Sequence, residues 1–538
     1  MSNLPWWQTA VIYQIYPRSF ADSNGDGVGD LRGIAGRIDY LSDTLGVDAI
    51  WLSPFYPSPM KDFGYDVSDY CDVDPVFGSL DDFDHLLAAV HERGMRMIID
   101  LVPNHTSDQH PWFVESRSSP ANPKRDWYCW RDPKPDGSPP NNWLSAFGGE
   151  AWELDGETGQ YYLHSFLTSQ PDLNWRNPEV QEAMFDVVRF WLDRGVDGFR
   201  LDVAHFIMKD PEWRDNPPSV TADDSFKSMG EYDSQLHLHD KGHADAHRVF
   251  RDFRALLDGY EGDRFSVGEI HVFDLDEWAE YYGKNLDELH MPFNFSLVWA
   301  PWDAGRFREL VGAVEAAVPD AGWPNYVLGN HDERRLVGRY GRRQARVAAM
   351  LLLTLRGTPT LYYGDELGLT NVDIPRDLQQ DPWALQEPAV ESRDGCRTPM
   401  PWDGSPTAGF SPPDSADPWL PIPEEHRAAS VAAQLEDPRS ILELYRQLLR
   451  LRRDHESLRV GDYQSATTAE GVFAYSRTLG ADQLLVALNF TDEERVVSTG
   501  RGEVLLSTGL DRDGSIRRRL ILRPNEGVVI RLESFSAM

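Results

Sequence analysis

The sequence of 538 residues predicts an α/β protein: a (β/α)8 TIM barrel, with a domain inserted after the third strand and a C-terminal antiparallel β-domain. Three observations support this fold. Short apolar segments alternate with longer helical patterns over residues 1–370, which is typical of βα units. Several of these segments are continuously apolar, as parallel strands buried on both faces are. Beyond residue 460, only short strands separated by turns are predicted.

Eight segments are predicted to form the barrel strands, because each is short and rich in β-branched or aromatic residues. Eight parallel strands are also the number that closes such a barrel. In chain order, the predicted strands begin at Ala10, Ala49, Met95, Asp197, Arg264, His290, Asn325 and Pro359. A helix is predicted over residues 440–455, where apolar residues recur at helical spacing.

Two interruptions of this alternation set the predicted domain boundaries. Residues 105–174 are rich in Pro, Trp, Asn and Gly and are predicted to form an inserted B domain. This insertion divides the barrel, domain A, into residues 1–104 and 175–460. The second part contains an irregular insertion at about 373–425, again rich in Pro and Asp. The C-terminal β-domain is predicted to cover residues 461–538.

The charge balance excludes several classes of partner. There are 87 acidic and 52 basic residues, which give a formal net charge of −35. Such a field repels nucleic acid phosphates and anionic lipid surfaces, so we expect no nucleic acid partner and no membrane partner. A neutral substrate is indifferent to this field. We expect a monomer or a homodimer.

Cysteine usage and the N-terminal segment indicate the compartment. Cys71, Cys129 and Cys396 form no C-x-x-C pair and no even framework, so neither disulfides nor structural zinc is expected. The first 20 residues lack a basic region followed by an apolar one, so no secretory signal is expected. The longest apolar run, Val347 to Leu355, is far too short to cross a membrane. We therefore predict a cytoplasmic protein.

Ionisable side chains gather at the carboxyl ends of the predicted strands, where barrels place catalytic groups. Three of them are carboxylates on different strands: Asp202, Glu269 and Asp332. A single carboxylate there could be a buried structural acid, but three with neighbouring His and Arg residues favour catalysis. Convergent carboxylates are what glycosidic bond cleavage needs, one ionised and the other protonated.

The expected protonation follows from the neighbours of these acids. Arg200 and Asp202 lie two residues apart on a strand, so both side chains point to the same face. A guanidinium beside Asp202 favours its ionised form. Glu269 must instead carry a proton to the leaving oxygen, and a like charge nearby would raise its pKa.

Several segments in order along the chain resemble the α-amylase family of glycoside hydrolases, family 13. Its four signature regions match DLVPNH, GFRLDVAH, GEI and NHD, which begin at Asp100, Gly198, Gly268 and Asn330. The segment QPDLN resembles the fifth region in the form of the α-glucosidase and oligo-1,6-glucosidase branch. The opening WWQTAVIYQIYPRSFADSNGDGVGD and the segment RTPMPW also resemble that branch.

This resemblance implies roles for individual residues. Asp202 is then the nucleophile, Glu269 the acid/base, and Asp332 the carboxylate that holds sugar hydroxyls. The residues implied to bind the terminal glucose are Asp62, Tyr65, His105, Arg200, His331 and Arg397. Asp62 and Arg397 suit a clamp on the far hydroxyl, which would close the pocket and enforce exo action. Phe147, Phe166 and Phe206 are expected to be apolar walls.

A loop at residues 22–30 has the pattern of a cation site. Its oxygens stand at alternate positions, and nine positions match an EF-hand loop: the expected metal ligands are Asp22, Asn24, Asp26, the Val28 carbonyl and Asp30. Gly33 occupies the position of the bidentate Glu, so a true EF-hand is not expected. A structural Ca²⁺, or Mg²⁺, is predicted instead, with a metal-free turn as the alternative. No organic cofactor is expected.

The sequence therefore predicts a retaining, exo-acting α-glucosidase that releases α-glucose from short α-1,4- or α-1,6-linked gluco-oligosaccharides by double displacement. Transglucosylation is a possible side reaction. In the branch resembled, Val after the nucleophile is typical of α-1,6 cleavage, and Val203 has this position, but Ala204 and His205 depart from the usual pattern. Two alternatives stay open: a disaccharide isomerase or transglucosidase that forms trehalose or isomaltulose, and a non-enzymatic relative similar to transporter heavy chains.

Overall fold

The structure, a computed structural model, describes residues 4–219, 229–387 and 390–533. Its centre is a curled parallel sheet with the strand order β10-β1-β2-β3-β7-β8-β9. The strands are β1 (Ile12–Ile15), β2 (Ala49–Leu52), β3 (Arg96–Leu101), β7 (Gly198–Leu201), β8 (Phe265–Gly268), β9 (Met291–Pro292) and β10 (Thr360–Tyr362). Parallel bridges join Asn294 to Tyr326 and Val327 to Thr360. The predicted strand from Asn325 thus closes the barrel through single bridges.

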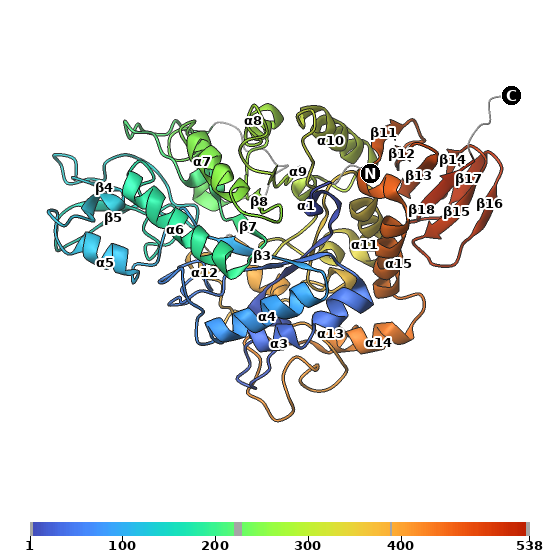
Figure 1. Ribbon diagram of the computed structural model, residues 1–538, viewed down its shortest axis with the longest axis horizontal. Helices are drawn as coiled ribbons and strands as arrows, with labels where there is room; N and C mark the ends of the chain where they lie inside the picture. Colours follow the sequence, from blue (N-terminus) through green and yellow to red (C-terminus); the bar gives the residue numbers. More distant parts are fainter. Residues whose placement is uncertain (1–3, 220–228, 388–389, 534–538) are drawn as a thin grey trace.

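Helices follow most barrel strands and cover the outside of the sheet (Figure 1). The long ones are α4 (Leu80–Glu92), α6 (Pro178–Arg194), α7 (Ala246–Asp258), α10 (Ala304–Ala317), α11 (Leu336–Thr354) and α15 (Ile441–Asp454). Shorter ones are α1 (Trp6–Thr9), α2 (Pro17–Phe20), α3 (Leu31–Ala35), α8 (Leu275–Glu280), α9 (Ser296–Trp299), α12 (Pro382–Gln386), α13 (Glu424–Ala428), α14 (Val431–Glu436) and α16 (Glu456–Val460). Of the irregular insertion at about 373–425, residues 388 and 389 lie outside the described residues.

Helix α6 shows how the local sequence sets an element that positions the site. Asn177 caps its start by accepting from the Glu179 N–H at 2.9 Å, and Pro178 takes the first helical position, where no N–H is needed. Gly195 ends the helix at φ 107°, a conformation that glycine adopts readily. The chain then turns directly into β7, which carries Arg200 and leads to Asp202.

A small antiparallel sheet lies in the segment between β3 and α6. Its order is β4-β6-β5, with β4 (Trp130–Arg131), β5 (Trp152–Leu154) and β6 (Tyr161–Leu163). Helix α5 (Pro111–Arg117) precedes it. This segment forms one end of the elongated molecule (Figure 1). Its Trp143 and Trp152 pack against each other and against Trp213, which follows β7 in the chain.

The C-terminal part is antiparallel and lies at the opposite end (Figure 1). One sheet has the order β11-β12-β13-β18-β15-β16, and β14 pairs with β17. The strands are β11 (Asp462–Ala466), β12 (Val472–Leu479), β13 (Asp482–Asn489), β14 (Arg495–Ser498), β15 (Gly502–Ser507), β16 (Gly514–Ile516), β17 (Arg519–Leu522) and β18 (Gly527–Leu532). Residues 534–538 of the predicted domain lie outside the described residues.

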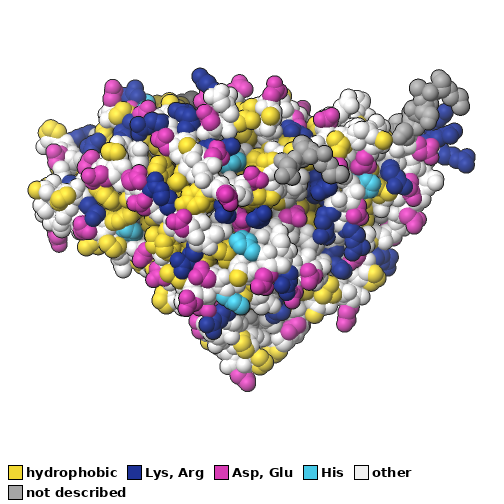
Figure 2. Space-filling view, in the orientation of Figure 1, with side chains coloured by type: hydrophobic (Ala, Val, Ile, Leu, Met, Phe, Trp, Pro, Cys, Tyr) yellow, Lys and Arg dark blue, Asp and Glu magenta, His cyan; other side chains and the backbone are white. Residues whose placement is uncertain are grey.

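Both the surface and the helices agree with the charge and hydropathy of the sequence. On the face shown in Figure 2, acidic side chains are spread over all parts of the molecule, with basic ones between them. In the part of the chain that the structure describes, every helix is too short or too polar to span a bilayer.

Candidate active site

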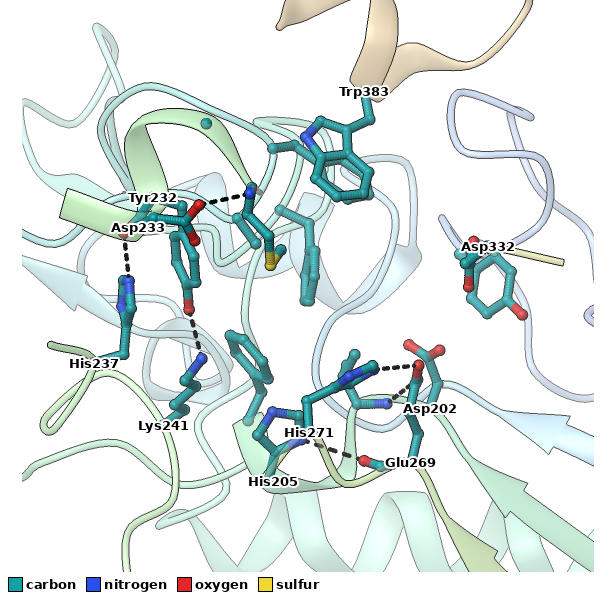
Figure 3. Close-up of a pocket in the computed structure, with 18 of the residues that line it drawn as sticks. Asp202, His205, Tyr232, Asp233, His237, Lys241, Glu269, His271, Asp332 and Trp383 are labelled. Atoms are coloured by element: carbon teal, nitrogen blue, oxygen red, sulfur yellow. Dashed lines mark hydrogen bonds and ion pairs between the residues drawn. The ribbon is translucent and has the colours of Figure 1, made fainter. Parts of the chain in front are cut away.

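The predicted catalytic acids share one large cavity at the carboxyl ends of the barrel strands. Its volume is about 1070 Å³, and Asp202, Glu269 and Asp332 all line it. Asp202 follows the last residue of β7, and Glu269 follows the last residue of β8. Predicted sugar-binding residues that also line it are Asp62, Tyr65, His105, Phe147, Phe166, Phe206 and His331. The structure therefore brings together side chains from segments that are far apart in the sequence (Figure 3).

Arg200 organises the floor of this cavity. It is 1% exposed and faces Asp100 on β3, because these two residues are register partners. Its Nη1 donates to Asp202 Oδ1 at 2.6 Å and to Asp100 Oδ1 at 2.7 Å. Its Nη2 donates to Glu269 Oε2 at 2.6 Å. One guanidinium thus holds three carboxylates, including both predicted reacting groups, as direct neighbours.

The backbone after the nucleophile brings a further donor to Glu269. Val203 has φ 35° and ψ 45°, a left-handed conformation that is unusual for a β-branched residue and costs about 1–3 kcal/mol. In this conformation its N–H donates to Glu269 Oε2 at 3.0 Å. The next N–H, of Ala204, donates to the Glu269 carbonyl at 3.1 Å. The strained turn therefore ties the end of β7 to the end of β8.

The neighbours of Glu269 favour its ionised form. Burial alone would raise the pKa of Glu269, but Arg200 and the hydrogen bond from His271 outweigh burial and hold this pKa below its usual value. Burial raises the pKa of Asp202 well above its usual value, against the opposing charge of Arg200. Burial also raises the pKa of Asp100 to about 7. Burial thus opposes a charge on both aspartates, while the hydrogen bonds from Arg200 and His271 favour a charge on Glu269.

Asp332 lies between two arginines. Its Oδ1 accepts from Arg397 Nη2 at 2.8 Å and from Arg393 Nη1 at 3.1 Å. Beside it, burial lowers the pKa of His331 to about 3, so this ring is neutral. The His331 Nδ1 accepts from Gln14 Nε2 at 2.8 Å, which leaves Nε2 to donate to the Tyr65 hydroxyl at 2.7 Å. This chain of bonds fixes the orientation of His331 in the cavity wall.

Asp62 is bonded by Arg393, an arginine that is not among the predicted site residues. Arg393 Nη2 donates to Asp62 Oδ1 at 3.2 Å, and Gln170 Nε2 donates to Asp62 Oδ2 at 3.1 Å. Arg397 is 1% exposed, lies behind the residues that line the cavity, and holds Asp332 and the His331 carbonyl instead. Burial raises the pKa of Asp62 to about 6, and Arg393 counters part of this rise. Arg393, four residues before Arg397, is thus the arginine that contacts Asp62, and a clamp of Asp62 and Arg397 on a sugar hydroxyl stays a prediction.

The apolar walls lie where the sequence predicts them. The Phe147 ring stacks on Trp383 with centroids 5.2 Å apart, and the Phe166 ring lies 5.2 Å from Phe206. Phe166 also contacts His105, whose pKa burial lowers to about 4. These rings form a continuous apolar surface beside the polar floor.

Several residues of the cavity have no counterpart among the predicted ones. Tyr232, His237 and Lys241 form a polar group on the side of the cavity away from Asp332 (Figure 3). The His237 ring stacks on Tyr232 at 3.5 Å, and Lys241 Nζ donates to the Tyr232 hydroxyl at 3.1 Å. Their segment has no periodic pattern, so the sequence contains no signal for them. For His271 the sequence does contain a signal. It lies two residues after Glu269, and side chains two residues apart on an extended segment point to the same face.

The predicted cation loop is held by hydrogen bonds of its own. Both oxygens of Asp22 accept backbone N–H groups, from Gly25 at 2.7 Å and from Gly27 at 3.0 Å. Asp30 caps α3 by accepting from the Gly33 N–H at 2.7 Å. A Cβ on Gly33 would lie 2.0 Å from the Ala21 carbonyl oxygen, so this position excludes the glutamate of an EF-hand.

The chemistry of this loop suits a hard cation, because all the ligands predicted for it are oxygens. Within residues 4–219, 229–387 and 390–533, no three or more His, Cys, Asp and Glu side chains are grouped as a metal site. A bound Ca²⁺ or Mg²⁺ with Asp22, Asn24, Asp26, Val28 and Asp30 as ligands stays a prediction.

Comparison with known proteins agrees with this geometry. Residues 14–461 match the family model described as the alpha amylase catalytic domain. A probable alpha-glucosidase of Rhizobium meliloti is 47% identical over 501 residues, 91% of this chain and 90% of the relative. An oligo-1,6-glucosidase of Parageobacillus thermoglucosidasius is 40% identical, with 91% of each chain covered.

Two solved structures show the same likeness in three dimensions. The alpha-glucosyl transfer enzyme XgtA superposes with a TM-score of 0.92 and 45% identity, over 98% of this chain and 99% of that one. The trehalulose synthase MutB of Pseudomonas mesoacidophila superposes with a TM-score of 0.88 and 36% identity, over 98% and 100%.

Proposed function

Because the chain belongs to the α-amylase family of glycoside hydrolases, we propose that it is a retaining, exo-acting α-glucosidase of short gluco-oligosaccharides. One observation carries this proposal: Arg200 binds Asp202 and Glu269 with the two ends of one guanidinium on the cavity floor. Retaining glycosidases need two carboxyl groups as close neighbours, so that one can attack while the other protonates the leaving oxygen.

In the proposed mechanism, Asp202 attacks the anomeric carbon of the terminal glucose and forms a β-glucosyl ester. Glu269 protonates the glycosidic oxygen as its bond to carbon breaks. A water molecule then attacks the ester, Glu269 accepts its proton, and glucose leaves with the α configuration. Asp332 lies at the same cavity, held by Arg393 and Arg397, where it can accept hydrogen bonds from sugar hydroxyls.

Exo action is supported by the contacts of Asp62. This carboxylate is buried and is bound on both oxygens, by Arg393 and by Gln170. Gln170 also contacts His105 at 3.1 Å. Such a bonded end accommodates the terminal hydroxyls of one glucose and leaves no passage for a longer chain, so cleavage proceeds from the non-reducing end.

The preferred linkage is the finer part of the proposal. Val203 lines the cavity directly after the nucleophile, and a contact of this size discriminates by about 1–3 kcal/mol. One of the relatives above is named a probable alpha-glucosidase and the other an oligo-1,6-glucosidase. We propose that the chain cleaves both α-1,4 and α-1,6 linkages, with isomaltose favoured by Val203.

A second function, disaccharide isomerisation or glucosyl transfer, is favoured by the solved structures that this chain resembles, a glucosyl transfer enzyme and a trehalulose synthase. The apolar rings of Phe147, Phe166, Phe206 and Trp383 line the same cavity. Apolar surface at a leaving-group site disfavours bound water, and this lets a sugar hydroxyl compete for the glucosyl ester.

Initial rates and products on maltose, isomaltose, sucrose, trehalose and soluble starch separate these functions. The proposal predicts glucose from maltose and isomaltose, and little hydrolysis of starch. If an isomerised disaccharide were the main product from sucrose, the function would be isomerisation and not hydrolysis. Rapid hydrolysis of starch would contradict the closed end at Asp62.

A further inference from the structure

Glu269 has a histidine partner that the mechanism above does not use. His271 Nε2 lies 2.9 Å from Glu269 Oε1. The two oxygens of Glu269 are therefore in different environments. Oε2 accepts from Arg200 Nη2 and from the Val203 N–H, two groups that keep their protons at all working pH values. Oε1 faces His271, a group that can give its proton away and take it back.

Aromatic rings fix the orientation of the His271 ring. It stacks on Phe295 with centroids 4.4 Å apart and planes 9° apart, and on Trp299 at 5.4 Å and 20°. Ring faces stabilise a positive charge placed over them. The His271 side chain is 26% exposed and lines the cavity, so it can exchange protons with a filled site. Its Nδ1 is buried without a hydrogen-bond partner among the described residues.

His205 is close to His271 but has a different environment. The two rings are 5.8 Å apart. Burial, together with the charge of Lys241, lowers the pKa of His205 well below its usual value, so this ring is neutral. His271, in contrast, has the carboxylate oxygen Oε1 of Glu269 as its hydrogen-bond partner. The ionisable groups around this pair are Arg200, Asp202, His205, Lys241, His331, Asp332 and Glu333.

We propose that His271 is the proton partner of Glu269: it holds the catalytic proton at Nε2 in the empty site and transfers it to Glu269 Oε1 during glycosidic cleavage. This inference rests on the proposed function. It resolves the conflict between an acid that must donate a proton and the donors that keep Glu269 ionised. His271 acts through Glu269 and is thus a positioning residue.

The proton balance closes over one turnover. In the first step, the His271 proton moves to Glu269 and on to the glycosidic oxygen, while the bond from this oxygen to the anomeric carbon breaks. Asp202 forms the new bond to that carbon, and His271 is left neutral. In the second step, water attacks the ester, its proton moves to Glu269 and on to His271 Nε2, and Asp202 leaves as a carboxylate. The ion pair of His271 with Glu269 is then restored.

A pH profile of kcat/KM on isomaltose tests this role. His271→Gln keeps a donor near Glu269 but cannot transfer a proton. In the variant, Glu269 must hold the proton alone beside Arg200, so the alkaline limb is expected to move down by at least about one pH unit, with a loss of about 10–100-fold at neutral pH. An alkaline limb that does not move would overturn the proposal.

α-Glucosyl fluoride separates proton transfer from damage to the site, because fluoride leaves without a proton from the enzyme. The kcat/KM of His271→Gln on this substrate is expected to stay within about threefold of the wild type. An equal loss on fluoride and on isomaltose would show a structural role and contradict the proposal. His455→Gln is the matched control, since His455 binds Asp482 at 3.0 Å, outside the residues that line the cavity.

A double-mutant comparison locates the effect on Glu269. If His271 acts through Glu269, His271→Gln should lower the isomaltose rate of Glu269→Gln by less than about twofold. A full 10–100-fold loss in that background would overturn the proposal. A wild-type protein that releases glucose from neither isomaltose nor α-glucosyl fluoride would instead refute the proposed function itself.

Discussion

One arginine side chain determines much of the site. Arg200 is buried and bonds Asp100, Asp202 and Glu269, so three acids share one positive charge. Because the three acids share one guanidinium, the protonation of one acid changes the pKa of the other two. The protonation of the site is thus a property of the cluster and not of any one acid.

Removal of the nucleophile should abolish turnover and leave the fold intact. Asp202→Asn keeps the shape of the side chain but cannot form the glucosyl ester, so kcat is expected to fall by about 10⁴-fold or more. Glucose release from isomaltose measures this loss, and circular dichroism reports the fold. Asp193→Asn, an exposed aspartate at the end of α6, is the control. Near-normal activity of Asp202→Asn would refute its role.

Arg393 should contribute to binding of the terminal glucose through Asp62 and Asp332. Arg393→Gln removes a charged donor from both carboxylates, and hydrogen bonds to charged groups contribute about 1.5–3 kcal/mol each. The expected result is a fall in kcat/KM of about 10–100-fold on isomaltose, measured at pH 7. Arg342→Gln, an exposed arginine on α11, should change nothing. If the kcat/KM of Arg393→Gln equalled that of this control, the contacts of Arg393 with Asp62 and Asp332 would not contribute to substrate binding.

The residues of the floor could be predicted from the sequence, and those of the loops could not. Asp202 and Glu269 follow barrel strands directly, so the strand ends place them. Arg393 and Lys241 reach the cavity from irregular segments, where neither period nor spacing indicates direction. The contacts of the two neighbouring arginines show the same limit, since no sequence signal indicates that Arg393 contacts Asp62 while Arg397 contacts Asp332.

Among the elements, the strands were easier to predict than their ends. All eight predicted barrel strands take part in the parallel barrel, but the one from Asn325 contributes only bridges at Tyr326 and Val327. The three-stranded sheet between β3 and α6 was not predicted as strands, because β4 is two residues long and its neighbours only three. Such short strands contain too few residues to show an alternating pattern.

Helix α15 is joined to the end of the barrel by a buried arginine. Arg452 donates to the carbonyls of Leu353, Gly357 and Leu458 at 2.6–3.1 Å. Arg452→Met would leave these buried acceptors without a donor, and the free energy of unfolding is expected to fall by about 3 kcal/mol or more. Thermal and urea unfolding measure the change. Arg450→Met, on the exposed side of the same helix, should have little effect, and an equal effect of both would contradict this account.

The loop at residues 22–30 should bind a cation if its oxygens act as predicted. Addition of Ca²⁺ is then expected to raise the thermal midpoint relative to EDTA, and about 2.7 kcal/mol of stabilisation corresponds to a concentration of 100 times the Kd. Asp26→Ala should remove this response, while Asp43→Ala, a change at an exposed residue, should keep it. Equal midpoints with Ca²⁺ and with EDTA would show that hydrogen bonds alone hold the loop.

At the scale of the whole molecule, the insertion and the C-terminal sheets lie at opposite ends of the barrel (Figure 1). The cavity draws its residues from the barrel and from the insertion, with Phe147 and Phe166 from the latter. This arrangement gives a polar floor from strand ends and an apolar wall from an added segment. The net charge of −35 disfavours anionic ligands, so the cavity suits a neutral sugar.

The configuration of the released sugar tests the central claim, that Asp202 and Glu269 act on opposite sides of one anomeric carbon in two displacements. Proton NMR within the first minutes of α-glucosyl fluoride hydrolysis, before mutarotation, distinguishes the two anomers of the released glucose, and the fluoride leaving group adds no second sugar to the spectrum. Double displacement predicts α-glucose as the first product, with the β-anomer rising only at the rate of mutarotation. β-Glucose as the first product would mean that water attacks directly, and it would contradict the assignment of Asp202 as the nucleophile.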